Sequence, residues 1–453
     1  MTDQQPSPPP SSSNPRLQAL LGHEFFAPAQ WKRRLALWIG AVLVALAAIV
    51  FAKASDWSFH LFQQMLGYGV WIPLVITPIV FAGLAWVTEG KLRATRGSGI
   101  PQVIGTLHIE DEGFRARMLA LPIAAGKMVL TLIALGVGAS IGREGPTVHV
   151  GAGLFYTLGR RFGFTDPKAA SRFILAGGAA GIAAAFNTPL AGVVFAIEEL
   201  AGTFEHRFSG LLLTAVIVGG VVSLGIMGNY AYFGEVEASL PLGHAWLAVL
   251  LTGIICGLLG GLFARLILLS RRGPLAAIGR LRSHAPVLFA AGCGLALAVG
   301  AGLGHNIASF LPGVPAGAVV LLGMSAYLSG VTGAPLTSAV IAMELTDNQD
   351  MVIPIMAACL LARAAASLFS PTPVYKDFAE RMVQDFERQH AASLAAAKAE
   401  TEAQGGGHPT AAPEDLEVVE PMPAGKTSAY DEQATPRDYD EQSAPRDTAP
   451  DAH

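Results

Sequence analysis

The chain has 453 residues, of which 52% are hydrophobic and only 14% charged, with a formal net charge of −4. Its mean hydropathy is +0.47, and its apolar runs are as long as the roughly 20 residues that one membrane crossing requires. This composition excludes an ordinary soluble protein and predicts an all-α polytopic membrane protein.

The first 30 residues are expected to form a disordered tail, because residues 1–16 are rich in proline and serine. They have no apolar core of the kind that a cleavable signal peptide requires. A basic triplet, Lys32-Arg33-Arg34, precedes the first apolar run. By the positive-inside tendency, it predicts a cytoplasmic N-terminus.

Residues 31–385 are predicted to form the transmembrane domain, because long uncharged runs recur through them. These runs are Leu35–Ala52, Val70–Thr88, Phe173–Ile197, Phe208–Gly234 and Ala285–Met343. Their many small residues favour close helix packing, and their glycines and prolines interrupt helices. We therefore expect short, tilted, re-entrant half-helices rather than a simple up-and-down bundle.

Two polar, glycine-rich pentapeptides interrupt the apolar sequence: GSGIP at residues 97–101 and GREGP at residues 142–146. Unpaired backbone N–H groups are costly in hydrocarbon, so such loops persist where they line a water-filled path or bind a ligand. Both lead into predicted helix starts, which offer free N–H donors and a positive dipole end. The two loops therefore predict an anion-binding site.

A weak internal repeat relates residues 187–198 to residues 333–344. In each copy a proline is followed nine residues later by a glutamate, as Pro189 by Glu198 and Pro335 by Glu344. Such repeats are typical of inverted halves with a binding site at their interface, although chance similarity between two apolar helices is the alternative.

Residues 386–453 are predicted to be an acidic, low-complexity, disordered C-terminal tail, also cytoplasmic. From residue 399 onward, thirteen acidic residues face three basic ones, and no periodic apolar pattern indicates a folded regulatory domain. The histidines and the three separated cysteines show no metal spacing, and no catalytic motif is present. We expect no cofactor, no enzymatic activity and no nucleic-acid partner.

Five motifs in order resemble the CLC family of chloride channels and proton/chloride antiporters. They are GSGIP at 97–101, GREGP at 142–146, AFNTPLAG at 185–192 leading into IEEL at 197–200, GAPL at 333–336 and MELTD at 343–347. The resemblance implies two inverted repeats per subunit and a homodimer of two independent pores in the lipid bilayer. A bacterial inner membrane is the expected location.

The same resemblance implies the chloride ligands. Ser98 matches the family's inner ligand, with the adjoining amides of Gly99 and Ile100, and Tyr375 matches the central tyrosine. A hydroxyl and oriented amide dipoles can bind a halide without trapping it. The alternatives are that Ser98 caps a helix and that Tyr375 is an interfacial aromatic anchor.

The resemblance also implies two functional carboxylates. Glu144 matches the gating glutamate, whose carboxylate competes with chloride for one positive site; an ion pair with Arg143 is the alternative. Glu199 matches the internal proton-transfer glutamate. Glu198 and Glu344 are interpreted as structural residues that accept hydrogen bonds from helix or loop N–H groups.

The chain departs from the family in its second half, where neither of the two expected glycine-rich loops is found. The segment Leu297–His305 resembles a junction between two separate family helices. The second repeat is therefore predicted to be shortened by about three helices, which would remove one wall of the pore. Segments 189–230 and 335–370, which match the family's dimer interface, are retained.

Three functions follow from these observations. Carboxylates at both Glu144 and Glu199 favour proton-coupled chloride antiport. A passive anion channel is the first alternative. The second is a non-transporting or defective subunit that still dimerises, which the shortened second repeat favours.

Overall fold

The structure is a computed structural model that describes most of the membrane domain. The described residues are 28–69, 71–90, 92–139, 141–201, 210–228, 239–240, 243, 245–269, 315–346 and 348–403. They are helical, as expected of an all-α protein. The N-terminal segment 1–27, the Leu297–His305 junction and the acidic sequence after residue 403 lie outside the described residues.

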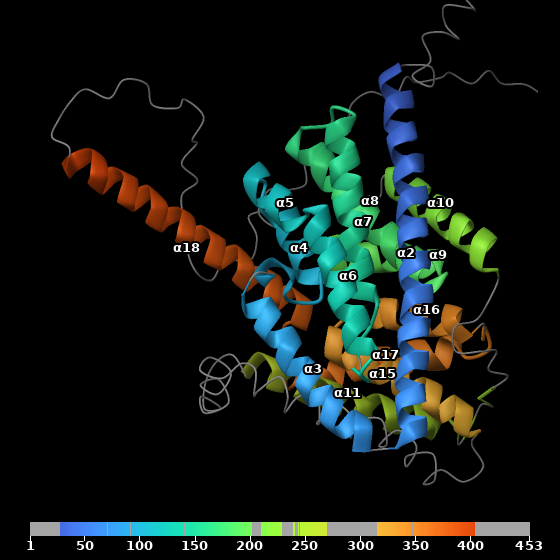
Figure 1. Ribbon diagram of the computed structural model, residues 1–453. Coiled ribbons are helices and arrows are strands. Elements are labelled where there is room, and N and C mark those ends of the chain that lie inside the picture. Colours follow the sequence, from blue (N-terminus) through green and yellow to red (C-terminus); the bar gives the residue numbers. More distant parts are fainter. Residues whose placement is uncertain are drawn as a thin grey trace, which may run out of the picture. The chain divides into compact units, whose positions relative to one another are not determined.

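Six helices in the described part of the chain are long and apolar enough to cross a membrane. The longest is α2, Pro28–Tyr68, drawn in blue in Figure 1. The others include α3 (Trp71–Glu89), α10 (Gly210–Met227) and α11 (Trp246–Leu269). Many large apolar side chains on these helices are exposed, as expected where lipid replaces water. The chain is an integral membrane protein.

Short helices separate the long ones, as the glycine and proline content predicted. They are α4 (Ile100–His108), α5 (Glu112–Met118), α9 (Pro189–Phe195) and α16 (Pro335–Thr346). Each is far shorter than the roughly 20 residues of a full crossing, so its ends lie within the membrane domain or at its edge.

The central pair of helices is α7 (Glu144–Arg161) and α8 (Pro167–Phe186), which lie side by side (Figure 1). Their backbones touch: a Cβ atom on Gly177 would lie 2.8 Å from the Gly151 carbonyl carbon. Small residues allow membrane helices to approach this closely. This pair supports the N-terminus of α7, where the GREGP loop begins the helix.

Helix α6 (Leu121–Leu135) packs against α7, and α2 covers α7 and α8 from another side. The contact with α2 is made by small and aromatic residues, including Ala41, Phe155 and Phe173, all fully or almost fully buried. A second core joins α11 to α15 (Ala316–Thr332) and α17 (Val352–Ala366).

The last described helix, α18, runs from Val374 to Ala403. Residues 386–403, which the sequence analysis placed in the C-terminal tail, are part of this helix. Alanine, glutamate, lysine and glutamine are strong helix formers, and they dominate this segment, so the helix continues although its surface is polar. Low apolar content excluded a packed domain there but did not exclude a helix.

The close approach of α7 and α8 can be tested at Gly151. We expect Gly151→Ala to lower stability by about 1–3 kcal/mol, because the added methyl group would overlap the Gly177 backbone. Gly83 in α3 is the matched control, since nothing lies within 4 Å of its missing Cβ. Thermal unfolding in detergent should show a lower midpoint for Gly151→Ala than for wild type, and no decrease for Gly83→Ala. Equal midpoints for the two variants would contradict the packing.

Candidate functional site

The two glycine-rich loops meet at the N-termini of α4 and α7. A Cβ on Gly145 would lie 3.0 Å from the Ser98 Cβ, and a Cβ on Gly99 would overlap the Gly145 carbonyl. Gly99 has φ +119°, a conformation that favours glycine. Glycine in both loops therefore brings Ser98 within contact of the residue that follows Glu144.

Ser98 does not cap α4, which removes one of its two interpretations. Gly99 is the N-cap residue of this helix, and no side chain caps it. Ser98 is exposed, whereas Ile100 is 3% exposed and packs in the core. The side chain of Ile100 is therefore part of the packing, and only its backbone amide is available to a ligand.

Glu144 is the first residue of α7, and its side chain folds back over the loop. The carboxylate lies against Gly142 and accepts a hydrogen bond from its own backbone N–H. Arg143 is buried beside it, and its charge acts on the same carboxylate. A carboxyl group thus already occupies the N-terminus of α7, where the helix dipole favours its ionised form.

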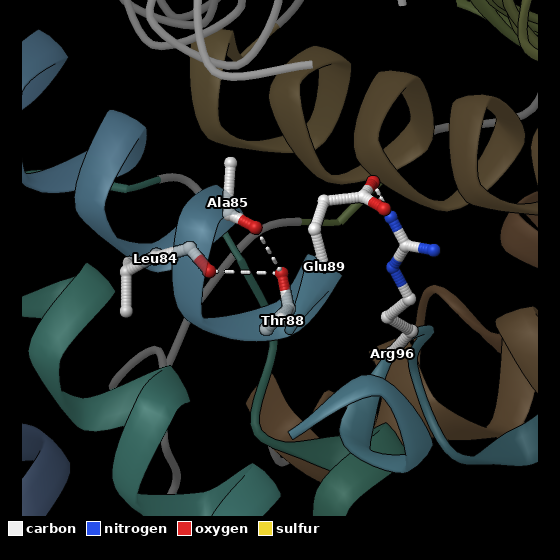
Figure 2. Close-up of polar contacts among 5 residues, drawn as sticks. All are labelled: Leu84, Ala85, Thr88, Glu89 and Arg96. Carbon is white, nitrogen blue, oxygen red and sulfur yellow. Dashed lines mark hydrogen bonds and ion pairs between the residues drawn. The ribbon is translucent and has the colours of Figure 1, made fainter. Parts of the chain in front are cut away.

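The connection from α3 to α4 is held by polar contacts, which Figure 2 shows in part. Glu89 at the end of α3 forms an ion pair with Arg96, and the Thr88 hydroxyl donates to the Leu84 carbonyl at 2.8 Å. The Arg96 carbonyl in turn accepts a hydrogen bond from the buried Gln102 amide. An ionised glutamate at position 102 could not donate this bond, which explains glutamine here.

Tyr375, in the first turn of α18, packs against the core cluster that contains α4 and α9. It lies close enough to Glu144 and Glu199 to interact electrostatically with both. A purely interfacial anchor would face the lipid surface. Its packing against this core cluster and its electrostatic interaction with two carboxyl groups instead agree with the central role predicted from the sequence.

Glu199 lies in η3 (Ala196–Ala201), a single π-helical turn that follows α9. Such turns are frequent at functional sites because they change the direction of successive side chains. Glu199 interacts electrostatically with Glu198, Arg363 and Lys376. It is therefore surrounded by groups from its own turn, from α17 and from α18.

Glu198 and Glu344 make matching contacts, which confirms the prediction that they are structural. Glu198 accepts bonds from the Leu336 and Thr337 N–H groups at 3.1 and 2.6 Å, at the start of α16. Glu344 accepts bonds from the Leu190 and Ala191 N–H groups at 3.2 and 2.7 Å, at the start of α9. Each copy of the repeat thus caps the other copy.

The sequence analysis missed two buried groups next to this site, Lys127 and His149. Lys127 is 3% exposed and His149 is fully buried; the Lys127 Nζ and His149 Nδ1 atoms have no hydrogen-bond partner among the described residues. The two side chains interact electrostatically, and the His149 Cβ lies against Gly99. A lysine alone in the apolar run 121–135 was the available signal, because charges at membrane depth default to function.

Comparison with known proteins gives one consistent result. The family model described as voltage gated chloride channel matches residues 79–299 and 296–367. The H(+)/Cl(-) exchange transporter ClcA of Yersinia pestis is 27% identical over 432 residues, covering 78% of this chain and 88% of the relative. The protein of the same name from Cronobacter sakazakii is 28% identical over 425 residues, covering 77% of this chain and 90% of the relative.

Solved structures agree at the level of the fold. A slow cyanobacterial Cl−/H+ antiporter superposes with a TM-score of 0.59 at 23% identity, covering 78% of this chain and 98% of that chain. A CLC-type fluoride/proton antiporter superposes with a TM-score of 0.58 at 22% identity, covering 78% of this chain and 99% of that chain.

The reciprocal caps can be tested by neutralising each carboxylate. Glu198→Gln and Glu344→Gln should each lower stability by about 1–3 kcal/mol, because each loses charge-assisted bonds to helix N–H groups. Glu380, exposed on α18, provides the control Glu380→Gln. The readout is thermal unfolding of the purified protein; a cap variant that unfolds with the control would refute the structural role.

Proposed function

The chain belongs to the voltage-gated chloride channel family, and from that premise we propose that it exchanges chloride for protons across the membrane. The observation that carries this proposal is the position of Tyr375, within electrostatic range of carboxylates at both Glu144 and Glu199. Relatives from Yersinia pestis and Cronobacter sakazakii bear the name H(+)/Cl(-) exchange transporter. The family membership makes the protein a chloride transporter rather than an enzyme.

Chloride binds at the N-terminus of α4 in this proposal. The Ser98 hydroxyl and the amides of Gly99 and Ile100 donate to the anion from one side, and the Tyr375 hydroxyl donates from the other. These donors are neutral dipoles, so they lower the energy of the anion without holding it irreversibly. The exposed Ser98, which caps no helix, supports this assignment.

Glu144 is the gate. Its ionised carboxylate lies at the positive end of α7, where it competes with chloride; the protonated form loses that attraction and swings away. Chloride entry at the site therefore depends on a proton at Glu144. The gate and the chloride ligand Ser98 are adjacent because Gly145 packs on Ser98.

Glu199 passes protons between the cytoplasm and Glu144. A carboxyl group at membrane depth is costly unless it has a function, and Tyr375 lies in electrostatic range of both carboxylates. Two separate carboxyl groups let protons take a route that chloride does not share. This separation is what distinguishes an exchanger from a passive channel.

We also propose a homodimer in a bacterial inner membrane, with both termini cytoplasmic and a transmembrane domain over residues 31–385. Helices α10 and α17 carry large exposed apolar side chains, among them Val221 at 58% and Ile353 at 71% exposure. Both helices lie in segments that match the family's dimer interface. The bacterial origin of the named relatives supports the location.

A second candidate is a dimerising subunit that does not transport. The family model matches in two pieces that overlap at residues 296–299, at the start of the predicted junction. The alignment to the Yersinia pestis protein spans 432 positions but takes in 78% of this chain, about 350 residues, so roughly 80 positions have no counterpart here. These findings support a shortened second repeat.

The deciding experiment is chloride efflux from liposomes that hold the purified protein, with external pH recorded at the same time. We expect chloride efflux accompanied by proton uptake. Efflux without proton movement would support the passive channel. No efflux from a folded dimer would support the non-transporting subunit.

Glu199→Gln should abolish proton movement while chloride efflux continues, because glutamine cannot carry a proton but leaves the chloride ligands in place. Glu144→Gln should also uncouple the two fluxes, since a neutral gate no longer responds to protons. Glu380→Gln, on the exposed face of α18, is the control and should leave both fluxes unchanged. Retained proton movement in Glu199→Gln would contradict its role.

Lys127→Met should weaken chloride binding severalfold, because it removes a buried amine that can carry a positive charge and that interacts with His149, whose Cβ lies against Gly99 at the α4 N-terminus. The control is Lys53→Met, since Lys53 is exposed on α2. Calorimetric titration of the detergent-solubilised protein with chloride measures both dissociation constants. An unchanged constant for a folded Lys127→Met would show that this charge does not act on the anion.

A further inference from the structure

Arg363 connects two parts of the molecule that the proposed exchange uses, and the sequence analysis did not identify it. It lies in the last turn of α17. Its guanidinium donates to the Ser370 carbonyl at 3.2 Å and to the Pro371 carbonyl at 2.7 Å. Both carbonyls belong to the turn that leads from α17 into α18.

This turn decides where Tyr375 lies, because only three residues separate Pro371 from it. The turn is fixed at two further points: the Ser370 hydroxyl donates to the Thr372 carbonyl at 3.0 Å, and Pro373 packs on Gly333. Gly333 has φ +84°, so a side chain there would be strained as well as crowded. Arg363 is the charged member of this set of contacts.

The same guanidinium acts on Glu199. The charged groups that interact with Glu199 come from three elements: Glu198 in its own π-helical turn, Arg363 in α17 and Lys376 in α18. The Glu198 carboxylate is engaged with the start of α16. Lys376 is exposed, so solvent weakens its effect, whereas Arg363 is only partly exposed and always carries its charge.

We propose that Arg363 is a positioning residue for proton transfer, because it holds the turn that carries Tyr375. One side chain therefore holds the turn that positions the tyrosine, and its positive charge also acts on Glu199 in the direction opposite to that of Glu198. Arginine suits this role because its planar fork can donate to two carbonyls in fixed directions. This inference rests on the proposed proton-coupled exchange.

The second arginine that binds this turn provides a matched control. Arg265 in α11 donates to the Phe369 carbonyl at 3.4 Å, and it is exposed. It is not among the charged groups that act on Glu199. Arg265→Gln therefore removes a contact to the same turn without changing the charge at the carboxyl group.

The test compares the number of protons moved per chloride in liposomes for wild type, Arg363→Gln, Arg363→Lys and Arg265→Gln. We expect Arg363→Gln to lower this ratio at least twofold while chloride efflux persists. Arg363→Lys should restore most of the ratio, because the charge remains although only one carbonyl can be bound. Arg265→Gln should keep the wild-type ratio.

A purely structural role would lower both fluxes in proportion and leave the ratio unchanged, and that result in Arg363→Gln would overturn the proposal. So would a lowered ratio in Arg363→Lys equal to that of Arg363→Gln, since charge would then be irrelevant. If Arg363→Gln does not fold, Arg363→Lys decides: its ratio should lie slightly below that of Arg265→Gln, and equal ratios in the two variants would overturn the proposal. Wild-type chloride flux without protons would instead refute the proposed exchange itself.

Discussion

Backbone N–H groups at helix starts inside the membrane domain are the constraint on which this structure depends. In hydrocarbon these groups must find an acceptor, and a helix that begins inside the domain leaves several of them free. At α9 and α16 the acceptors are Glu344 and Glu198, each supplied by the opposite copy of the repeat. The N–H groups at those two helix starts are capped by carboxylates, and these hydrogen bonds join the two copies of the repeat.

The starts of α4 and α7 are treated differently. No side chain caps α4, and the carboxyl group at the start of α7 belongs to Glu144, the helix's own first residue, which a proton can neutralise. The helix starts thus differ within one protein: α9 and α16 have acceptors from the opposite copy of the repeat, whereas α4 and α7 begin at the site proposed to bind the anion. Because Gly99 and Gly145 let the two open ends touch, one ion can interact with both.

Around these ends the domain keeps most positive charge buried or engaged. Lys127 and His149 lie behind the α4 start, Arg143 lies beside Glu144, and Arg363 holds the turn before Tyr375. In the proposed site the ligands of the anion are neutral dipoles, and none of these four basic side chains is among them. That arrangement lowers the cost of bringing an anion into the membrane without binding it too tightly to leave.

The sequence by itself determined the membrane class and the interrupted helices, because glycine and proline in apolar runs have local consequences. The residues proposed to contact or gate the anion were named from their motifs alone. The sequence also determined the structural role of Glu198 and Glu344, since the repeated nine-residue spacing from proline to glutamate is visible in the printed chain. Apolar content failed as a guide at α18, where helix propensity alone extends the helix to Ala403.

Only the tertiary structure decided which helix starts are closed and which stay open, because the capping glutamates lie about 140–150 residues from the N–H groups they bind. The same holds for Arg363, whose contact with the Tyr375 turn is local but whose electrostatic interaction with Glu199 joins two elements that are far apart in the sequence. Such long-range contacts depend on how helices pack, and packing is set by the whole set of small residues at once rather than by any one motif.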